Sequence, residues 1–239
     1  EPRPREPAPP PRETAPASPA DVLTPEDALG KRLRAEALSQ RGRRVLVSIQ
    51  DRALWLLEGD DVALAAPVAV GKEEGFVWEG KRYDFTTPQG KRTVRSKATT
   101  PIWVPPDWHY LEIAAERELK PVHLKVGQRV PLSDSTVIEV RGKQVGRLNR
   151  YGNFHPFTPG MEIIFDGKIF VPPFGTAQRS VPEVLGTHKL ELGDGYLIHG
   201  TNEEGSIGDA VSHGCVRMYN DDVARLFELV PTGTPVFIY

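Results

Sequence analysis

Short runs of aliphatic, β-branched and aromatic residues, each followed by turn-forming residues, are the feature that most limits how this chain can fold. Residues 45–49 and 53–57 form two such runs, and the polar segment 50–52 separates them. Runs of this length and composition, with turn residues between them, are typical of an antiparallel meander. We therefore predict a mainly β fold with few helices. Further strands are expected at residues 62–70, 136–140, 145–148, 162–165, 168–171, 189–192, 196–199 and 235–239.

Three segments carry helix signals. Thr24 is the expected N-cap of a short helix that extends to about Gln40, with Pro25 in its first turn. A later helix is expected to begin at the N-cap Asn220, to bury one apolar face and to end before Pro231. Residues 111–119 are a further candidate.

The N-terminal segment differs in composition from the rest of the chain. Residues 1–20 contain eight prolines and no valine, isoleucine, leucine, methionine or aromatic residue. Such a segment has no apolar side chains to bury, so we expect residues 1–23 to be a Pro-rich disordered spacer, in keeping with a tether to an anchor. Residues 24–44 are then a helix and linker, and residues 45–239 the main domain.

Composition excludes several classes of protein. The 239 residues include 30 Lys and Arg against 32 Asp and Glu, a net charge of −2, which does not favour binding to nucleic acid or to anionic membranes. The longest apolar runs, such as residues 62–70, are much shorter than the roughly 20 residues that span a bilayer. Cys215 is the only cysteine, which excludes intramolecular disulfides and CxxC-type zinc or redox sites.

Common nucleotide-binding and hydrolase motifs do not fit either. Residues 75–81 imitate a phosphate-binding GxxxxGK loop, but Arg82 stands where a serine or threonine would hold Mg²⁺, and no helical pattern follows. The sequence has no HExxH, GxSxG or SxxK motif.

The residues around Cys215 carry the strongest chemical signal. The sequence Ser212-His213-Gly214-Cys215 follows His199, which lies sixteen residues before the cysteine at the end of an expected strand. A cysteine nucleophile needs a base within hydrogen-bond reach and backbone N–H groups directed at the oxyanion. Nearby imidazoles and Arg217 are expected to favour the thiolate. We interpret Cys215 as a nucleophile rather than an inert buried thiol.

This arrangement resembles the L,D-transpeptidase (YkuD-type) catalytic domain family. His199, Ser212-His213-Gly214-Cys215 and the tail Val216-Arg217-Met218-Tyr219-Asn220 match the family signature, while residues 87–90 and 233–236 resemble its upstream and closing elements. The resemblance covers residues 45–90 and about 186–239. It implies a β-sandwich or barrel with the cysteine in a groove, interrupted here by a large insertion at about 91–185.

The family resemblance also implies roles for individual residues. Cys215 is the nucleophile and His199 the base, with His213 kept as an alternative base or as a residue that shapes the turn. Gly214 and Ser212 belong to the turn that holds the oxyanion. Four further residues are assigned to substrate binding or to structure, namely Arg217, Asn220, Gly200 and Thr201.

No cofactor is implied. A zinc site built from His199, His213 and Cys215 would need a fourth ligand or water, and we predict no metal. The remaining histidines have no ligand spacing and are interpreted as surface or core residues, namely His109, His123, His155 and His188.

The implied reaction acts on peptidoglycan stem peptides in the periplasm or cell envelope of a bacterium. The thiolate attacks the third stem residue, D-Ala leaves, and an amine acceptor completes a 3-3 cross-link. Carbapenem-type β-lactams are expected to acylate Cys215. Two alternatives stay open: a peptidoglycan hydrolase with the same Cys-His pair, either an L,D-carboxypeptidase or an amidase, and a non-catalytic wall-binding module. The aromatic residues of the insertion either line a groove or form a core, and a lid there would decide which acceptor enters.

Overall fold

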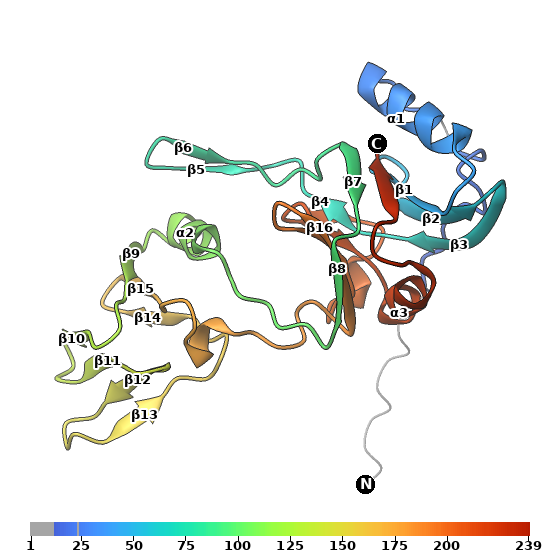
Figure 1. Cartoon of the computed structure of the whole chain (residues 1–239). Helices are drawn as coiled ribbons and strands as arrows, with labels where there is room; N and C mark the ends of the chain where they lie inside the picture. The colour runs from blue at the N-terminus through green and yellow to red at the C-terminus, as the bar shows by residue number, and fades with distance from the viewer. Residues whose placement is uncertain (1–11, 23) are drawn as a thin grey trace, which may run out of the picture. The chain divides into compact units, whose positions relative to one another are not determined.

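A computed structural model describes residues 12–22 and 24–239 of the chain. It is mainly β, with three α-helices among the described residues, and it divides into two compact units (Figure 1). Unit 1 contains the described residues up to 74 together with residues 85–100 and 185–239, and unit 2 contains residues 75–84 and 101–184. No described helix is both long enough and apolar enough to cross a membrane.

Unit 1 is built on a five-stranded sheet. Its order is β3 (Asp61–Pro67), β2 (Ala53–Glu58), β1 (Arg44–Ser48), β20 (Pro235–Ile238) and β7 (Gly90–Thr93). The β1–β2–β3 meander is antiparallel, as the sequence predicts, whereas β1 and β20 pair in parallel. Strands from early and late in the sequence therefore pair in the middle of one sheet.

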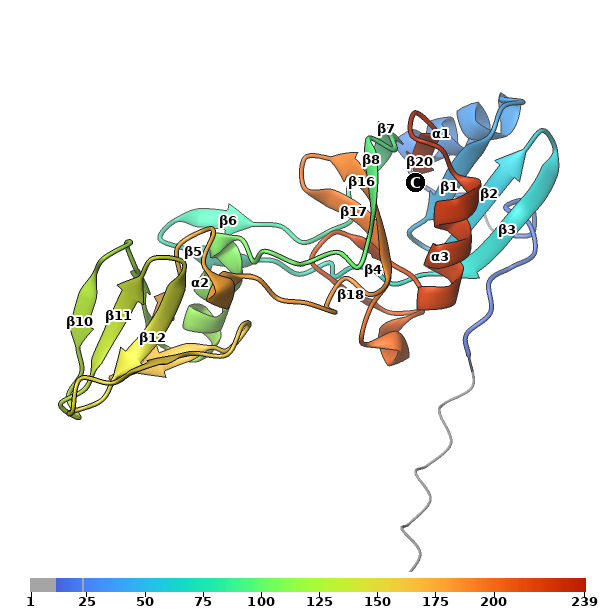
Figure 2. The ribbon, with the colours of Figure 1, turned by 60° about the horizontal axis from the view of Figure 1, so that its bottom comes forward.

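Both faces of this sheet are buried, because alternate side chains of β1 and β2 enter two different cores. Val45 and Leu54 belong to one core, which α3 (Asn220–Leu229) covers with Val223 and Leu226. Leu46 and Trp55 belong to the other core, which α1 (Ala28–Ser39) covers with Leu33 and Ala37. Figure 2 shows α1 and α3 beside the sheet.

A second sheet of unit 1 carries the sequence motif. Its order is β19 (Val216–Arg217), β17 (Tyr196–His199), β16 (His188–Gly193) and β8 (Ser96–Thr99). Beside it, β18 (Ala210–Ser212) pairs in parallel with β4 (Val70–Gly71). A short 3₁₀ helix, η2 (Glu204–Ser206), lies between β17 and β18.

Unit 2 has cores of its own. One sheet has the order β10 (Arg129–Pro131), β11 (Val137–Arg141), β12 (Gln144–Leu148) and β13 (Phe154–Pro156), and another has the order β14 (Ile163–Phe165), β15 (Lys168–Val171) and β9 (Lys120–His123). Helix α2 (Asp107–Glu116), the 3₁₀ helix η1 (Ala177–Arg179) and the hairpin of β5 (Phe76–Trp78) and β6 (Lys81–Tyr83) complete it. Ile138, Val140 and Phe170 are fully buried among these elements.

The predicted mainly β class is confirmed. The family resemblance implies a β-sandwich or a barrel. The sheets formed by the described residues are open, so they do not form a barrel. Unit 2 lies within the predicted insertion at 91–185 except for the 75–84 hairpin, while β7 and β8 at residues 90–99 pair with strands of unit 1. β7 and β8 belong to unit 1 because they pair with strands far away in the sequence, and such long-range pairing leaves no local pattern from which it could be predicted.

The predicted helix starts were wrong by a few residues. The N-cap of α1 is Asp27 rather than Thr24, because the Asp27 carboxylate accepts a hydrogen bond from Gly30 N at 2.7 Å. The N-cap of α3 is Tyr219 rather than Asn220. The candidate helix 111–119 is α2, which begins and ends earlier.

Described residues of the Pro-rich segment contact unit 1 through hydrogen bonds, where the sequence predicts a disordered spacer. The Trp55 indole N–H donates to Pro16 O at 2.8 Å, and Glu13 N donates to the Tyr219 hydroxyl at 3.0 Å. A backbone carbonyl and a backbone N–H thus hold this proline-rich segment against unit 1. Residues 1–11 and 23 of the predicted spacer lie outside the described part of the chain.

Candidate active site

Cys215 lies immediately before β19, the strand that runs parallel to β17. The register places Val216 beside Ile198 and Arg217 beside His199. Cys215 Sγ is 3.9 Å from Gly195 O, in the turn that precedes β17. The parallel pairing therefore brings the two ends of the sequence motif, the cysteine and the strand that ends in His199, to adjacent strands.

The turn before the cysteine is held by the buried Ser212 hydroxyl. Ser212 Oγ donates to Cys215 O at 2.5 Å and accepts from Gly214 N at 3.2 Å. The backbone carbonyl of Ser212 accepts from Lys72 N at 2.9 Å, which joins the turn to β4. The Ser212 side chain is thus a structural part of the turn, and its own polar groups are occupied.

Gly214 is required at its position for two reasons. Its φ of +106° is in a region that L side chains rarely adopt, and an added Cβ would lie 3.0 Å from Tyr196 Cε1 and 3.3 Å from Thr86 O. Sequence reasoning did not single out Tyr196 or Thr86 as site residues. Thr86 follows β6 in sequence by only a few residues, and its contact with the turn depends on tertiary structure.

His199 is buried, with 4 % of its surface exposed, and its Nδ1 lies 2.5 Å from Gly200 O. A carbonyl oxygen only accepts hydrogen bonds, so Nδ1 carries the proton and Nε2 is the basic nitrogen. The pKa of His199 is lowered to about 4, chiefly by burial and also by the positive charge of Arg217, against the backbone hydrogen bonds of Gly200 and Leu185, which favour the protonated ring. The imidazole is therefore neutral at pH 7.

The Cys215 thiol is half-buried, and burial raises its pKa. The Leu197 backbone and the Arg217 charge act in the opposite direction but are smaller effects. Arg217 thus favours the thiolate, as expected, but burial outweighs its effect. The pair at rest is a neutral thiol and a neutral imidazole.

Asn220 connects the segments around His199. Its side-chain Nδ2 donates to Thr201 O at 2.7 Å, its Oδ1 accepts from Thr187 N at 2.9 Å, and its backbone N donates to Glu204 Oε1 at 3.0 Å. A Cβ added to Gly200 would lie 2.3 Å from Asn220 Oδ1, so the glycine lets this amide approach the residue whose carbonyl orients His199. Thr201 is buried.

Arg217 and His213 lie in different surroundings. Arg217 Nη1 is 3.2 Å from Glu203 Oε2, and its backbone exchanges hydrogen bonds with Ala69. The ring of His213 packs edge-on against Phe85, with 4.5 Å between centroids. The structure thus gives His213 an aromatic contact and gives His199 the buried, carbonyl-oriented position.

The other histidines make contacts of different kinds. His109 contacts Trp103, His123 is 3.4 Å from the Asp107 carboxylate, and His188 packs on Phe227, while His155 lines a pocket of unit 2. Within residues 12–22 and 24–239, no three His, Cys, Asp or Glu side chains are grouped as metal ligands would be.

A cavity of about 820 Å³ in unit 1 adjoins the cysteine turn. Gly71, Thr86 and Thr87 line it, and Gly71 N donates to Thr87 Oγ1 at 2.7 Å. Thr86 also lies beside the turn, since its carbonyl oxygen would be 3.3 Å from a Cβ added to Gly214, so the cavity wall and the turn share this neighbour. Other lining residues come from the start of α1 and from β1, among them Asp27, Leu29 and Ser48.

The sequence also matches a known protein family. The family model for the L,D-transpeptidase catalytic domain matches residues 42–238. Putative L,D-transpeptidase YkuD of Bacillus subtilis is 50 % identical over 62 residues, which are 26 % of this chain and 38 % of the relative. Probable L,D-transpeptidase YbiS of Escherichia coli is 54 % identical over 52 residues, 22 % of this chain and 17 % of the relative. The chain thus matches well under half the length of these relatives.

A crystal structure of L,D-transpeptidase 3 from Mycobacterium tuberculosis, in complex with a faropenem-derived adduct, also aligns with the chain. The alignment covers 82 % of this chain and 59 % of that one, at 14 % identity and a TM-score of 0.42. The family model, which covers most of the sequence, identifies the class: the chain belongs to the L,D-transpeptidase catalytic domain family.

Proposed function

We propose that this protein is a peptidoglycan L,D-transpeptidase in which Cys215 is the nucleophile and His199 the base. The observation that carries the proposal is the strand register, which sets Cys215 beside β17 while Gly200 O fixes the tautomer of a buried, neutral His199. Family membership supports the substrate class. The site of action is the periplasm or cell envelope.

The first half-reaction follows from the protonation states. Because both groups are neutral at rest, the proton moves from Sγ to His199 Nε2 as Sγ attacks the carbonyl of the third stem residue. The oxyanion that forms is held by the Cys215 N–H, since the Gly214 N–H is bonded to Ser212. When the tetrahedral intermediate collapses, D-Ala leaves with the proton from His199, and a thioester remains on Cys215.

The second half-reaction regenerates the enzyme. An amine of a neighbouring stem peptide attacks the thioester, His199 accepts the proton from that amine, and the thiol leaves as a thiolate that recovers the proton from His199. The product is a 3-3 cross-link. Burial serves this cycle because an imidazole with a low pKa releases protons readily to each leaving group. The strained amide of a carbapenem presents the same carbonyl chemistry, so it acylates Cys215.

The experiment that tests the proposal is product analysis by mass spectrometry after incubation of the protein, or its Cys215→Ala variant, with a disaccharide tetrapeptide. Cys215-dependent dimers that have lost one D-Ala support the transpeptidase. Tripeptide monomers alone, again dependent on Cys215, would replace it with an L,D-carboxypeptidase. Unchanged substrate together with a Cys215 that no carbapenem acylates would favour a wall-binding module.

A further inference from the structure

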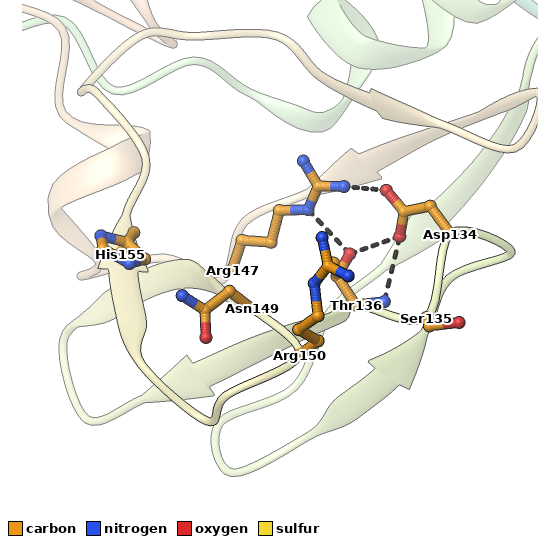
Figure 3. A pocket seen from close by; sticks show the side chains of 7 residues that line it. All are labelled: Asp134, Ser135, Thr136, Arg147, Asn149, Arg150 and His155. Atoms are coloured by element: carbon orange, nitrogen blue, oxygen red, sulfur yellow. Dashed lines mark hydrogen bonds and ion pairs between the residues drawn. The ribbon is translucent and has the colours of Figure 1, made fainter.

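Unit 2 contains a pocket of about 610 Å³ that the cysteine chemistry does not use. It lies at one end of the β10–β13 sheet, between the β10–β11 turn and the β12–β13 turn (Figure 3). All of its lining side chains are polar: Asp134, Ser135, Thr136, Arg147, Asn149, Arg150 and His155.

Sheet register explains how a polar pocket forms beside an apolar core. Arg147 on β12 is directly opposite His155 on β13 and Ile138 on β11, so these three share one face of the sheet. Ile138 is fully buried in the core, and the Arg147 guanidinium covers the ring of Phe165 at 4.8 Å. Arg147 and His155 therefore lie at the boundary between the apolar core and the polar pocket.

The acceptors of the pocket are used by the protein itself. Asp134 Oδ1 accepts from the backbone N and the hydroxyl of Thr136, and its Oδ2 pairs with Arg147. Asn149 Oδ1 accepts from Tyr151 N at 2.9 Å and from Asn153 N at 3.0 Å. The side-chain oxygens that could receive a ligand's hydrogen bonds are thus largely occupied.

The hydrogen-bond donors of the pocket, in contrast, are available to a ligand. Arg150 is exposed, and among the described residues its guanidinium contacts the ring of Tyr151, at 5.7 Å. Asn149 Nδ2 points into the pocket between Arg147 and His155 in Figure 3. Arg147 is paired with Asp134, so the positive charge of the lining that no carboxylate of the pocket compensates is that of Arg150.

We propose that this pocket binds a carboxylate-bearing saccharide. Donor groups that exceed acceptor groups select an acceptor-rich ligand, and one uncompensated guanidinium matches the charge and planar geometry of one carboxylate. The exposed Tyr151 ring, with 78 % of its surface accessible, offers an apolar face at the rim for a sugar ring. The choice of a muramic acid as the natural source of that carboxylate rests on the proposed function.

Binding to the full chain tests this by ¹⁵N-resolved NMR titration with N-acetylmuramic acid, N-acetylglucosamine, glucuronic acid and inorganic phosphate. N-acetylmuramic acid is expected to bind and to shift the signals of residues 134–155. N-acetylglucosamine has the same ring without the lactyl carboxylate, and we expect it to bind at least about tenfold more weakly. Glucuronic acid separates recognition of any sugar acid from recognition of the lactyl group. Equal binding of both N-acetyl sugars, or saturation by phosphate alone, would overturn the proposal.

Arg150→Gln is the decisive variant, with Arg141→Gln as its matched control. Arg141 is also an exposed arginine of this sheet, but it pairs with Glu139 outside the pocket. Arg150→Gln is expected to weaken binding about tenfold or more and Arg141→Gln to leave it unchanged; equal effects of the two changes would refute the site. The titration is repeated in Cys215→Ala, so that loss of pocket binding and loss of transpeptidation are read separately.

Discussion

The cysteine turn of unit 1 and the pocket of unit 2 use polar groups in opposite ways. In the turn, the Ser212 hydroxyl both donates and accepts within four residues, and Gly214 allows contacts that a side chain would prevent. In the pocket, the Asp134 and Asn149 acceptors are satisfied while the Arg150 guanidinium is exposed. A catalytic site needs its reacting groups in a fixed geometry, whereas a binding site needs hydrogen-bonding groups that the protein itself does not already use. The predictions below test this difference.

The largest effect is expected from Cys215→Ala. Removing the nucleophile should lower turnover at least about 10³-fold while the fold is kept, because the thiol is only half-buried and donates a single weak hydrogen bond. Product analysis on a tetrapeptide substrate, with circular dichroism as the folding control, measures this. Val211→Ala, a change at an exposed neighbour in β18, should stay fully active. Turnover by Cys215→Ala would show that the rigid turn is not the catalytic centre.

His199→Gln is expected to lower turnover about 10²- to 10⁴-fold, the range typical for loss of a general base. His213→Gln should lower it far less, since His199 is the buried imidazole that Gly200 O orients, whereas the His213 ring packs against Phe85. Second-order rates of Cys215 alkylation, measured from about pH 5 to about pH 10, provide a readout that does not need the natural substrate. If His213→Gln were the more damaging change, the assignment of the base would be reversed.

The sequence predicts the cysteine turn but not the pocket, because the turn is a local motif and the pocket is formed only by the folded chain. The order His199, Ser212, Gly214, Cys215 is a local pattern with a shared chemical purpose, and strands at residues 168–171 and 196–199 coincide with β15 and β17. The direction of the thiol pKa could not be predicted, because burial depends on elements far away in sequence. The pocket around Arg147 and Arg150 has no motif at all, since it depends on which donors the folded turns leave exposed.

Folding stability should depend on pH through His199. Its pKa is about 4 in the folded protein against an ordinary 6.5, so below pH 6.5 the unfolded chain binds more protons and stability decreases as pH falls toward 4. The loss between about pH 7.5 and about pH 4 is about 3 kcal/mol in the free energy of unfolding. Urea unfolding of the wild type and of His199→Gln at several pH values measures it. The difference between the two proteins isolates His199 from titrating carboxylates, and a constant difference would contradict the burial argument.

Gly214→Ala tests how much the fixed geometry of the turn matters. An alanine at this position would have to adopt a φ of +106°, and its Cβ would lie 3.0 Å from the Tyr196 ring. We therefore expect a loss of about 1–3 kcal/mol in stability and a decrease in turnover. Gly233→Ala is the matched control, because its φ is +90° but its Cβ would enter open space. The control should show the cost of φ strain alone and keep its activity. Equal activity in both variants would mean that the crowding at Gly214 has no catalytic role.

The smallest effect is expected from Asp134→Asn in the pocket. Its pair with Arg147 is partly exposed, with 47 % and 33 % of the two side chains accessible, and ion pairs of this kind contribute less than about 1 kcal/mol. The amide keeps an oxygen that can accept from Thr136, so the turn should persist and transpeptidase turnover in unit 1 should not change. The lining then has one more uncompensated positive charge, and N-acetylmuramic acid should bind as well as before or more tightly. Unfolding curves and the same NMR titration check both points. A large loss of stability would show that the pocket, like the cysteine turn, depends on a fully satisfied internal network, and the contrast between the two regions would fail.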